Sequence, residues 1–415
     1  MHYDVVVIGA GASGLIAAGR AAERGAKVLL IEKKERAGRK MLISGKGRCN
    51  ITNQSSQSNH FKNIFPNGRY LKHAYNAFFV NNILELLRKE GLETKTERGS
   101  RIFPISDKSK DVVDALLQYI KKNNAEIKYH TSVEKILTEN NKIKGVVVKE
   151  KSSTQEILCT NVILCTGGKS YPATGSTGDG FRLAAELGHS IVPPKPSLVP
   201  LVTKGNIAEK LQGLSLKNVN AMLWVNNKKV SEEFGEMLFA HFGLTGPIIL
   251  TLSRIAVVEL DKNNKVKITI DLKPALDYQK LDSRLLRDIN EHGKKNIDNI
   301  FKQWLPSKMI PVFIELLELD AKKAAHKITS KERKGILQLM KNFEFEVTGH
   351  RGFKEAIITS GGISTAEVSS KTMQSQKVEN LYFAGEVLNL DANTGGYNFQ
   401  IAYSTAWLAA ENIKF

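Results

Sequence analysis

The first eighteen residues place a glycine-rich turn between an apolar run and an alanine-rich segment. Val5 to Ile8 are continuously apolar, Gly9-Ala10-Gly11-Ala12-Ser13-Gly14 follows at once, and Leu15-Ile16-Ala17-Ala18 comes next. A buried parallel strand is typically an unbroken β-branched run, a sharp turn needs glycine, and an Ala/Leu-rich stretch favours helix. The pattern therefore predicts a strand, a turn and a helix, whose N-terminus would attract an anion.

Each glycine of this turn has its own expected role. Gly9 permits the sharp turn, Gly11 lets the backbone approach a pyrophosphate, and Gly14 lets the helix pack closely on the strand. A second strand is predicted from Lys27 to Ile31 and ends at Glu32, about where a carboxylate meets an adenosine ribose. The spacing favours a dinucleotide site, which these residues alone leave open between FAD and NAD.

The C-terminal part of the chain has a similar pattern. Asn380 to Glu386 are predicted to form a short buried strand that ends in Gly-Glu, and Gly395-Gly396 precede a helix expected to reach Ala410. The dipole of that helix would favour negative charge on a reduced flavin ring. FAD is long enough to be held by both ends of one chain, so this segment makes FAD the better interpretation.

A second strand-to-glycine junction lies in the middle of the chain. The apolar run that ends at Cys165 leads into Thr166-Gly167-Gly168. Ligands of a doubly wound α/β sheet lie beyond the carboxyl ends of its strands, so the two junctions are predicted to converge on one ligand. Between them, the apolar spacing predicts helices at 81–89 and 111–122, and alternating strands at 125–149.

Three prolines suggest a domain boundary at Pro193-Pro194-Lys195-Pro196, because this stretch is expected to continue neither a sheet nor a helix. We expect a discontinuous first domain at 1–193 and 346–415. A β domain is expected at 194–273, with a strand near 343–348 as a candidate to complete it. The apolar period then becomes helical, which predicts a helical subdomain at 274–342.

The composition is that of a globular chain of two or three domains, with 415 residues of which 42% are hydrophobic. The longest apolar runs are far shorter than the ~20 residues of a membrane helix, and the chain begins with a strand rather than a signal peptide. We therefore expect a cytoplasmic protein. Cys49, Cys159 and Cys165 lack the spacing of a metal site or a disulfide framework, and the last two are expected in the core.

The net charge is +18, from 60 Lys plus Arg against 42 Asp plus Glu. Such a balance attracts polyanions, although a lysine-rich organism would also produce it. The basic residues are dense from Lys33 to Arg48, a stretch that contains the single acid Glu35. It overlaps the segment 37–53, which is predicted to be a loop across the site. Part of this charge would serve cofactor phosphates. The rest would face a substrate.

Five segments of the chain resemble a known family, the bacterial FAD-dependent oxidoreductases named aminoacetone oxidase-like or NAD(P)/FAD-dependent oxidoreductase, which includes ribosomal RNA dihydrouridine synthases. The resemblance covers essentially the whole chain, and the second and last segments are long and specific. The segments are GAGASGLIAA at Gly9 to Ala18, AGRKMLISGKGRCNITN at Ala37 to Asn53, TGGKSYPATGSTGDG at Thr166 to Gly180, HFGLTGP at His241 to Pro247, and LYFAGEVLNLDANTGGYNFQIAYSTA at Leu381 to Ala406.

The resemblance implies a glutathione-reductase-type FAD-binding Rossmann domain with an inserted β domain and a helical subdomain. It also implies FAD contacts at positions that match the family motifs. These are Ala12, Ser13, Glu32, Lys33, Lys40, Gly45, Val133, Thr166, Gly167, Gly385, Glu386, Gly396, Tyr397 and Asn398. The glycines Gly9, Gly11, Gly14 and Gly395 complete the two helix N-termini, and Ser44 is a further candidate from the loop.

The function that the resemblance implies is reduction of a uridine C5=C6 bond in large-subunit ribosomal RNA, with NADH as electron donor. Other members are named as aminoacetone oxidases or as enzymes of bile-acid dehydroxylation. A small cationic amine gains nothing from a strongly basic protein, and a bile-acid carboxylate needs one or two cations. An RNA substrate neutralises many cations, so the charge favours RNA. The candidates for contact with RNA are Arg36, Arg39, Lys46 and Arg48. The small-molecule flavoenzyme is the alternative.

Reduction of uridine needs an acid that protonates C5. Cys49 is the first candidate, because the neighbouring charges of Lys46 and Arg48 are expected to lower its pKa. The alternative is that Cys49 only packs against the flavin. His241 is a weaker candidate, since a lone histidine is more often structural. The sequence contains no second complete GxGxxG, so NADH is expected to visit the flavin transiently.

Overall fold

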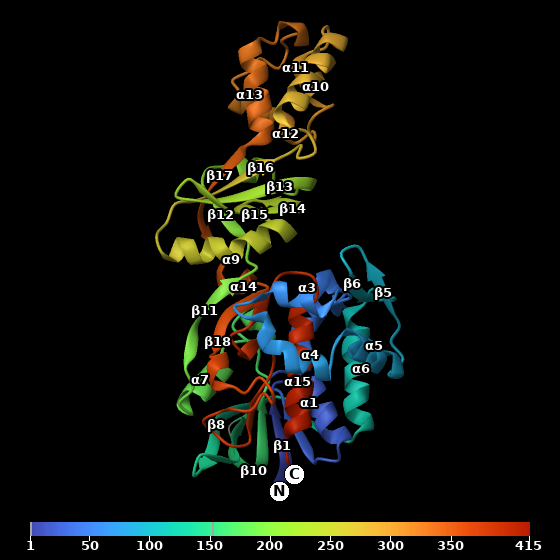
Figure 1. The fold of residues 1–415 in the computed structure, drawn as a ribbon, viewed down its shortest axis with the longest axis vertical. Coiled ribbons are helices and arrows are strands. Elements are labelled where there is room, and N and C mark those ends of the chain that lie inside the picture. Colours follow the sequence, from blue (N-terminus) through green and yellow to red (C-terminus); the bar gives the residue numbers. More distant parts are fainter. Residues whose placement is uncertain (1, 152) are drawn as a thin grey trace. The chain divides into compact units, whose positions relative to one another are not determined.

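The computed structural model describes residues 2–151 and 153–415, which form two compact units. The first unit contains the chain up to residue 196 together with residues 353–415, and the second contains residues 197–352. Figure 1 shows both ends of the chain at the same sheet of the first unit. No helix within the described ranges combines the length and the apolar character needed to cross a membrane.

The first unit is built on a seven-stranded sheet of order β7-β2-β1-β10-β9-β8, in which β19 also pairs with β10. The strands β2, β1, β10 and β19 run parallel, whereas β9 is antiparallel to β10. The first half of β10 pairs with β9 and its last residues pair with β19. The strands are β1 (His2–Ile8), β2 (Val28–Ile31), β7 (Glu126–Lys128), β8 (Thr131–Glu139), β9 (Lys142–Glu150), β10 (Ser153–Leu164) and β19 (Leu381–Phe383).

Helices cover this sheet, which explains why its central strands are apolar throughout. Val5, Val6 and Val7 of β1 are completely buried, as expected for a parallel strand covered on both faces. The helix α1 (Ala12–Glu23) follows the glycine turn as predicted, and it packs against α6 (Ser109–Lys122) and α15 (Tyr397–Asn412).

The smaller elements of the first unit lie between these helices and strands. The segment 37–53, predicted as a loop, contains one short α-helix, α2, and one turn of 3-10 helix at 44–47. The elements are α2 (Arg39–Ile43), β3 (Thr52–Asn53), α3 (Gln57–Lys62), β4 (Ile64–Phe65), α4 (Lys72–Ala77), α5 (Val80–Lys89), β5 (Thr94–Glu97), β6 (Arg101–Pro104), α7 (Asp179–Glu186), β18 (Ile358–Ile363) and β20 (Asp391–Ala392).

The proline-rich stretch is a strand, contrary to the prediction that it continues no sheet. The strand β11 (Ile191–Ser197) contains Pro193, Pro194 and Pro196 and pairs with β18 in a two-stranded sheet. Proline is tolerated in an edge strand because only one side of the strand needs hydrogen-bond donors.

The second unit contains a closed barrel of order β12-β15-β14-β13-β16-β17. The last strand, β17, pairs with β16 on one side and with β12 on the other, which closes the barrel. The long strand β14 was not predicted, because its first half is charged. The strands are β12 (Leu201–Thr203), β13 (Ser215–Val225), β14 (Lys228–Ala240), β15 (Gly243–Thr245), β16 (Val266–Asp271) and β17 (Phe343–His350).

Helices complete the second unit. Besides the short α8 (Ile207–Lys210), one long helix lies inside the segment predicted to be a β domain. This helix, α9 (Pro247–Asp261), begins directly after β15. Phe343 of β17 contacts Phe239 of the barrel and Phe313 of α12, so barrel and helices share one core. The other helices are α10 (Tyr278–Glu291), α11 (Ile297–Phe301), α12 (Met309–Leu316) and α13 (Ser330–Lys341), and α14 (Gly352–Glu355) follows the barrel.

Candidate functional site

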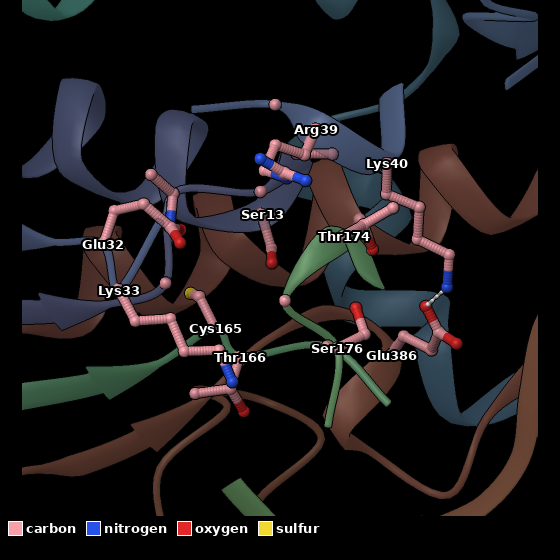
Figure 2. A pocket seen from close by; sticks show the side chains of 18 of the residues that line it. Ser13, Glu32, Lys33, Arg39, Lys40, Cys165, Thr166, Thr174, Ser176 and Glu386 are labelled. Atoms are coloured by element: carbon pink, nitrogen blue, oxygen red, sulfur yellow. Dashed lines mark hydrogen bonds and ion pairs between the residues drawn. The ribbon is translucent and has the colours of Figure 1, made fainter. Parts of the chain in front are cut away.

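A pocket opens at the carboxyl ends of β1, β2 and β10 in the first unit. It encloses about 1330 Å³, counting the part open to solvent. The wall combines residues from both predicted strand-to-glycine junctions with residues that follow β19 and begin α15, so the predicted convergence is confirmed. Figure 2 shows Glu32 and Lys33 on one side of the pocket and Lys40 with Glu386 on the other.

The glycine turn leaves open space at the N-terminus of α1. A Cβ on Gly11 would meet no atom within 4 Å, and Gly11 is the N-cap of α1, whose first turn has no side-chain capping hydrogen bond. Gly9 has a φ of +99°, which favours glycine, and a Cβ on Gly14 would lie 1.8 Å from the Gly9 carbonyl oxygen. The turn thus presents unpaired amides to the pocket and has no space for a side chain at Gly14.

Glu32 joins the turn to the end of β2. Its carboxylate accepts hydrogen bonds from the backbone amides of Ala10 and Lys34, both at 2.8 Å. The side chain is therefore held in one position on the pocket wall, where a ribose hydroxyl can donate to it.

Lys40 and Glu386 form an ion pair on the opposite side. The Lys40 ammonium donates to Glu386 at 2.6 Å and to the Ser170 hydroxyl at 2.5 Å. Ser170 and the backbone amide of Thr359 donate to the other oxygen of Glu386 at 2.7 and 2.9 Å. Residues from α2, the 166–180 loop, β18 and the turn after β19 are thereby fixed in one network.

Two buried polar atoms of the wall have no partner among the described residues. These are Arg39 Nε and Thr166 Oγ1. The other nitrogens of the Arg39 guanidinium bind Glu35 and the Ala173 carbonyl, the latter at 3.1 Å. Because buried donors are nearly always paired in folded proteins, both atoms point to a ligand with acceptor oxygens.

Most of the predicted cofactor contacts line this pocket, and a smaller set does not. Gly14, Gly45, Gly385, Gly395, Gly396 and Tyr397 are absent from its wall. Gly385 and Gly396 instead allow close packing, since a Cβ would lie 2.8 Å from Ser13 Oγ and 2.4 Å from the Thr52 carbonyl carbon. The predicted residues on the wall are Gly9, Gly11, Ala12, Ser13, Glu32, Lys33, Lys40, Ser44, Val133, Thr166, Gly167, Glu386 and Asn398.

Tyr397 and Asn398 begin α15 but have different surroundings. The Tyr397 hydroxyl accepts from Asn59 at 3.1 Å, and its ring lies edge-on to His60 with ring centres 4.8 Å apart. Asn398 lines the pocket, and its amide group bonds both the amide and the carbonyl of Ala392. Tyr397 therefore anchors the helix start, while Asn398 connects the preceding loop to the pocket.

Sequence reasoning did not assign several wall residues to the cofactor. Asp179 holds the Lys33 ammonium at 2.5 Å, and Thr174 and Ser176 lie on the wall beside it. All three belong to the glycine-rich stretch 166–180, so their motif was the available signal. Cys165, expected in the core, is buried and also lines the pocket.

The expectation that neighbouring charges lower the pKa of Cys49 is wrong. Cys49 is completely buried, and this burial raises its pKa to about 12, against a smaller opposite effect of its hydrogen bond with Ser44. Arg48 turns to Glu97 at 2.8 Å and Asp107 at 3.2 Å, and Lys46 is exposed. Cys49 is also not among the residues of the pocket wall.

The remaining candidates lie in three environments. Arg36 and Arg39, predicted to contact RNA, are both on the pocket wall beside Glu35. Arg48 is engaged by carboxylates, whereas Arg36 and Lys46 are exposed. His241 is exposed in the turn between β14 and β15 of the second unit, where its ring contacts Phe242.

Comparison with known proteins identifies the family. A family described as HI0933-like protein Rossmann domain matches residues 3–412. The chain belongs to this family. It is 28% identical over 412 residues to the ribosomal RNA dihydrouridine synthase of Escherichia coli K12, covering 99% of this chain and 98% of that protein. The corresponding protein of Haemophilus influenzae is 30% identical over 415 residues, covering 100% and 99%.

A relative with a different substrate is equally similar. The 3-dehydro-bile acid delta(4,6)-reductase of Clostridium scindens is 30% identical over 409 residues, which is 97% of each chain. Among solved structures, a 3-ketosteroid delta1-dehydrogenase from Sterolibacterium denitrificans has a TM-score of 0.51 at 15% identity, covering 99% of both chains, which supports the fold alone. This HI0933-like chain is thus an FAD-dependent oxidoreductase with a Rossmann-type FAD-binding domain.

The residues present fit FAD. A pyrophosphate suits the open amides at Gly11 and the unpaired Nε of Arg39, and a ribose hydroxyl suits the fixed carboxylate of Glu32.

Proposed function

We propose that this oxidoreductase reduces the C5=C6 bond of a uridine in large-subunit ribosomal RNA. The observation that carries the proposal is the full-length similarity to two proteins named ribosomal RNA dihydrouridine synthase, from two organisms. The net charge of +18 agrees with it, because RNA is a polyanion. The reaction would take place in the cytoplasm, where the RNA is made.

The proposed cofactor site uses the pocket as described. Gly11 and Arg39 would hold the pyrophosphate, and Glu32 would hold the adenosine ribose. The ion pair of Lys40 and Glu386 would hold the opposite end of FAD. The second helix N-terminus, at Gly395 and Gly396, would supply a positive dipole. The other proposed contacts on the pocket wall are Gly9, Ala12, Ser13, Lys33, Ser44, Val133, Thr166, Gly167 and Asn398.

FAD, when bound, supplies the hydride that reduces the double bond, and NADH is the proposed external donor. The chain's own residues bind, orient and exclude water. Lys40 keeps a fixed ammonium at the wall because Glu386 and Ser170 hold it. Cys49 does not suit the role of the acid that protonates C5, since its thiol is buried away from the pocket.

The second candidate is reduction of a conjugated small molecule such as a bile-acid-like enone. The similarity to the bile-acid reductase supports it, at an identity no lower than that of the RNA enzymes. Both substrates contain a carbon–carbon double bond conjugated to a carbonyl, so the same cofactor site suits either. The surroundings of the pocket, and not the cofactor site, would therefore decide which of the two substrates is reduced.

The decisive test is the dihydrouridine content of ribosomal RNA from a strain that lacks the gene. Mass spectrometry should show loss of dihydrouridine, return with the wild-type copy, and no return with Glu32→Ala, which would bind FAD poorly. Unchanged dihydrouridine after deletion would refute the RNA reaction. Equal rescue by Glu32→Ala would indicate a role without turnover, and NADH-driven reduction of a bile-acid dienone but not of RNA would favour the second candidate.

A further inference from the structure

The segment that contains α3, β4 and α4 has no carboxylate. From Arg36 to Leu84 the chain contains eight Lys or Arg residues and no Asp or Glu. In most of the chain acids and bases alternate, so the charges pair locally. A long stretch without acids leaves its exposed cations unneutralised by their own sequence neighbours.

Three of these cations are on the outer surface of the segment. Lys62 ends α3, Arg69 lies in the turn before α4, and Lys72 begins α4, and all three are exposed. Within the described residues, none of the three has an ion-pair or side-chain hydrogen-bond partner. By contrast, Lys40 and Arg48 of the same stretch are held by carboxylates from other segments.

The outer surface also carries neutral hydrogen-bonding groups. Asn67 and Asn76 are exposed beside the cations, and Ser56 and Ser58 are exposed at the start of α3. Phosphate and sugar contacts to nucleic acids come from Lys and Arg together with Ser, Asn and backbone amides. We call the surface formed by Lys62, Asn67, Arg69, Lys72 and Asn76 the acid-free face.

Buried aromatic contacts hold this face in place. His60 of α3 is completely buried and lies edge-on to Tyr75 of α4, with ring centres 5.5 Å apart. The same His60 ring contacts Tyr397 at the start of α15. The cations therefore stand on an ordered surface that packs against the helix leading out of the pocket, and Figure 1 shows α3 and α4 beside α15.

The acid-free face is joined to the pocket by a short chain of hydrogen bonds. Strand β4 pairs with β20, where Ala392 lies opposite Ile64. Asn63 accepts from the Asn393 amide at 3.0 Å, and Asn398 binds Ala392 from the other side. Since Asn398 lines the pocket, Ala392 and Asn398 connect the candidate site to β4, the strand that lies between Lys62 and Asn67 in the chain.

We propose that the acid-free face binds the phosphate backbone of the RNA whose uridine enters the pocket. This inference rests on the proposed function, because it names the surface that would hold that substrate. A base that reaches a buried flavin leaves its stack, so the adjoining strand has to be held nearby. Cations beside the pocket hold such a strand without reading its sequence.

The test compares two triple variants of the FAD-loaded protein. K62Q/R69Q/K72Q removes three charges from the acid-free face, and K121Q/K135Q/K149Q removes three exposed charges elsewhere in the same unit. Affinity for protein-free large-subunit ribosomal RNA is measured against salt. The face variant should reduce the slope of log affinity against log salt by about 2 and weaken binding roughly tenfold or more at physiological salt, with the control variant within about twofold of wild type.

Both variants should keep FAD content and thermal stability, because the substituted side chains are exposed and lie outside the pocket wall. Equal RNA affinity of the two variants, with a wild type that binds RNA and forms dihydrouridine, would refute the face and leave the function standing. A wild type that neither binds RNA nor forms dihydrouridine would refute the function itself. If the face variant lost binding only to phosphatidylserine vesicles, the occupant would be a membrane and the RNA proposal would be wrong.

Discussion

At the scale of single residues, neighbours in the sequence often have different surroundings in the folded chain. Gly11 and Gly14 belong to the same turn, yet one faces open space and the other lies against a carbonyl. Lys46 and Arg48 flank Cys49 closely in sequence, yet Arg48 turns to Glu97 and Cys49 turns into the core.

Gly11→Ala should separate cofactor binding from folding. The backbone of Gly11, with a φ of −81°, suits alanine, and a Cβ there meets nothing in the protein. The apoprotein should fold and gain up to about 1 kcal/mol from the less flexible unfolded chain. The Kd for FAD should rise roughly tenfold or more, because the Cβ fills the space expected for pyrophosphate. FAD titration and thermal unfolding of the apoprotein check both parts; unchanged FAD affinity would place the pyrophosphate elsewhere.

At the scale of elements, the strand-turn-helix unit depends on contact between backbones. The helix α1 reaches the sheet because Gly14 has no side chain to separate it from the Gly9 carbonyl. The prolines of β11 are tolerated because β11 is an edge strand, whereas a central strand would not accept them. The helix α9 was missed because its apolar residues are as consistent with strands as with a buried helix.

Gly14→Ala should disrupt this packing. A Cβ 1.8 Å from the Gly9 oxygen forces α1 away from β1, and we expect a loss of about 2 kcal/mol or more in the free energy of unfolding. Urea unfolding of the apoprotein measures the loss. Gly11→Ala is the control, because Gly11 lies in the same turn with a φ of −81° and has no atom within 4 Å of its Cβ. Equal losses in the two variants would show that close packing is not the cause.

At the scale of the molecule, burial of thiols links stability to pH. Burial raises the pKa of Cys49, Cys159 and Cys165 to about 12 each, above the ordinary value of 9.0. Their folded forms stay neutral while the unfolded chain ionises. The stabilising effect of the neutral state is therefore complete below pH 9 and is lost as pH rises from about 9 to about 12.

The free energy of unfolding should fall less steeply with rising pH in Cys49→Ala, by about 1.4 kcal/mol per pH unit between pH 9.5 and 11. Urea unfolding at several pH values gives the slope. Val7→Ala is the matched control, since it truncates a buried side chain without a titrating group and should lower stability equally at every pH. If the pH dependence of the free energy of unfolding were unchanged in Cys49→Ala, Cys49 would be accessible to solvent. Its role as the acid that protonates C5 would then have to be tested again.

Much of the first unit was predictable from the chain alone because its signals are local. A strand, a glycine turn and a helix follow one another within eighteen residues, and the same pattern recurs at Cys165 and at Gly395. The parallel sheet and the convergence of the junctions follow from these patterns, whereas most of the thirteen predicted cofactor contacts on the pocket wall were implied by the resemblance to the family. Resemblance of the long motifs identified the family.

Only the tertiary structure decided what the charged and polar residues do. Arg39 was predicted to face RNA, yet its guanidinium lies on the pocket wall because Glu35 and the Ala173 carbonyl hold it there. Cys49 lost its role as the preferred acid because burial, not sequence neighbours, sets its pKa. Charge and pKa depend on atoms brought together from distant segments, whereas turns and strands depend on adjacent residues. The glycine turn was therefore visible in the sequence, and the electrostatics of the pocket required the fold.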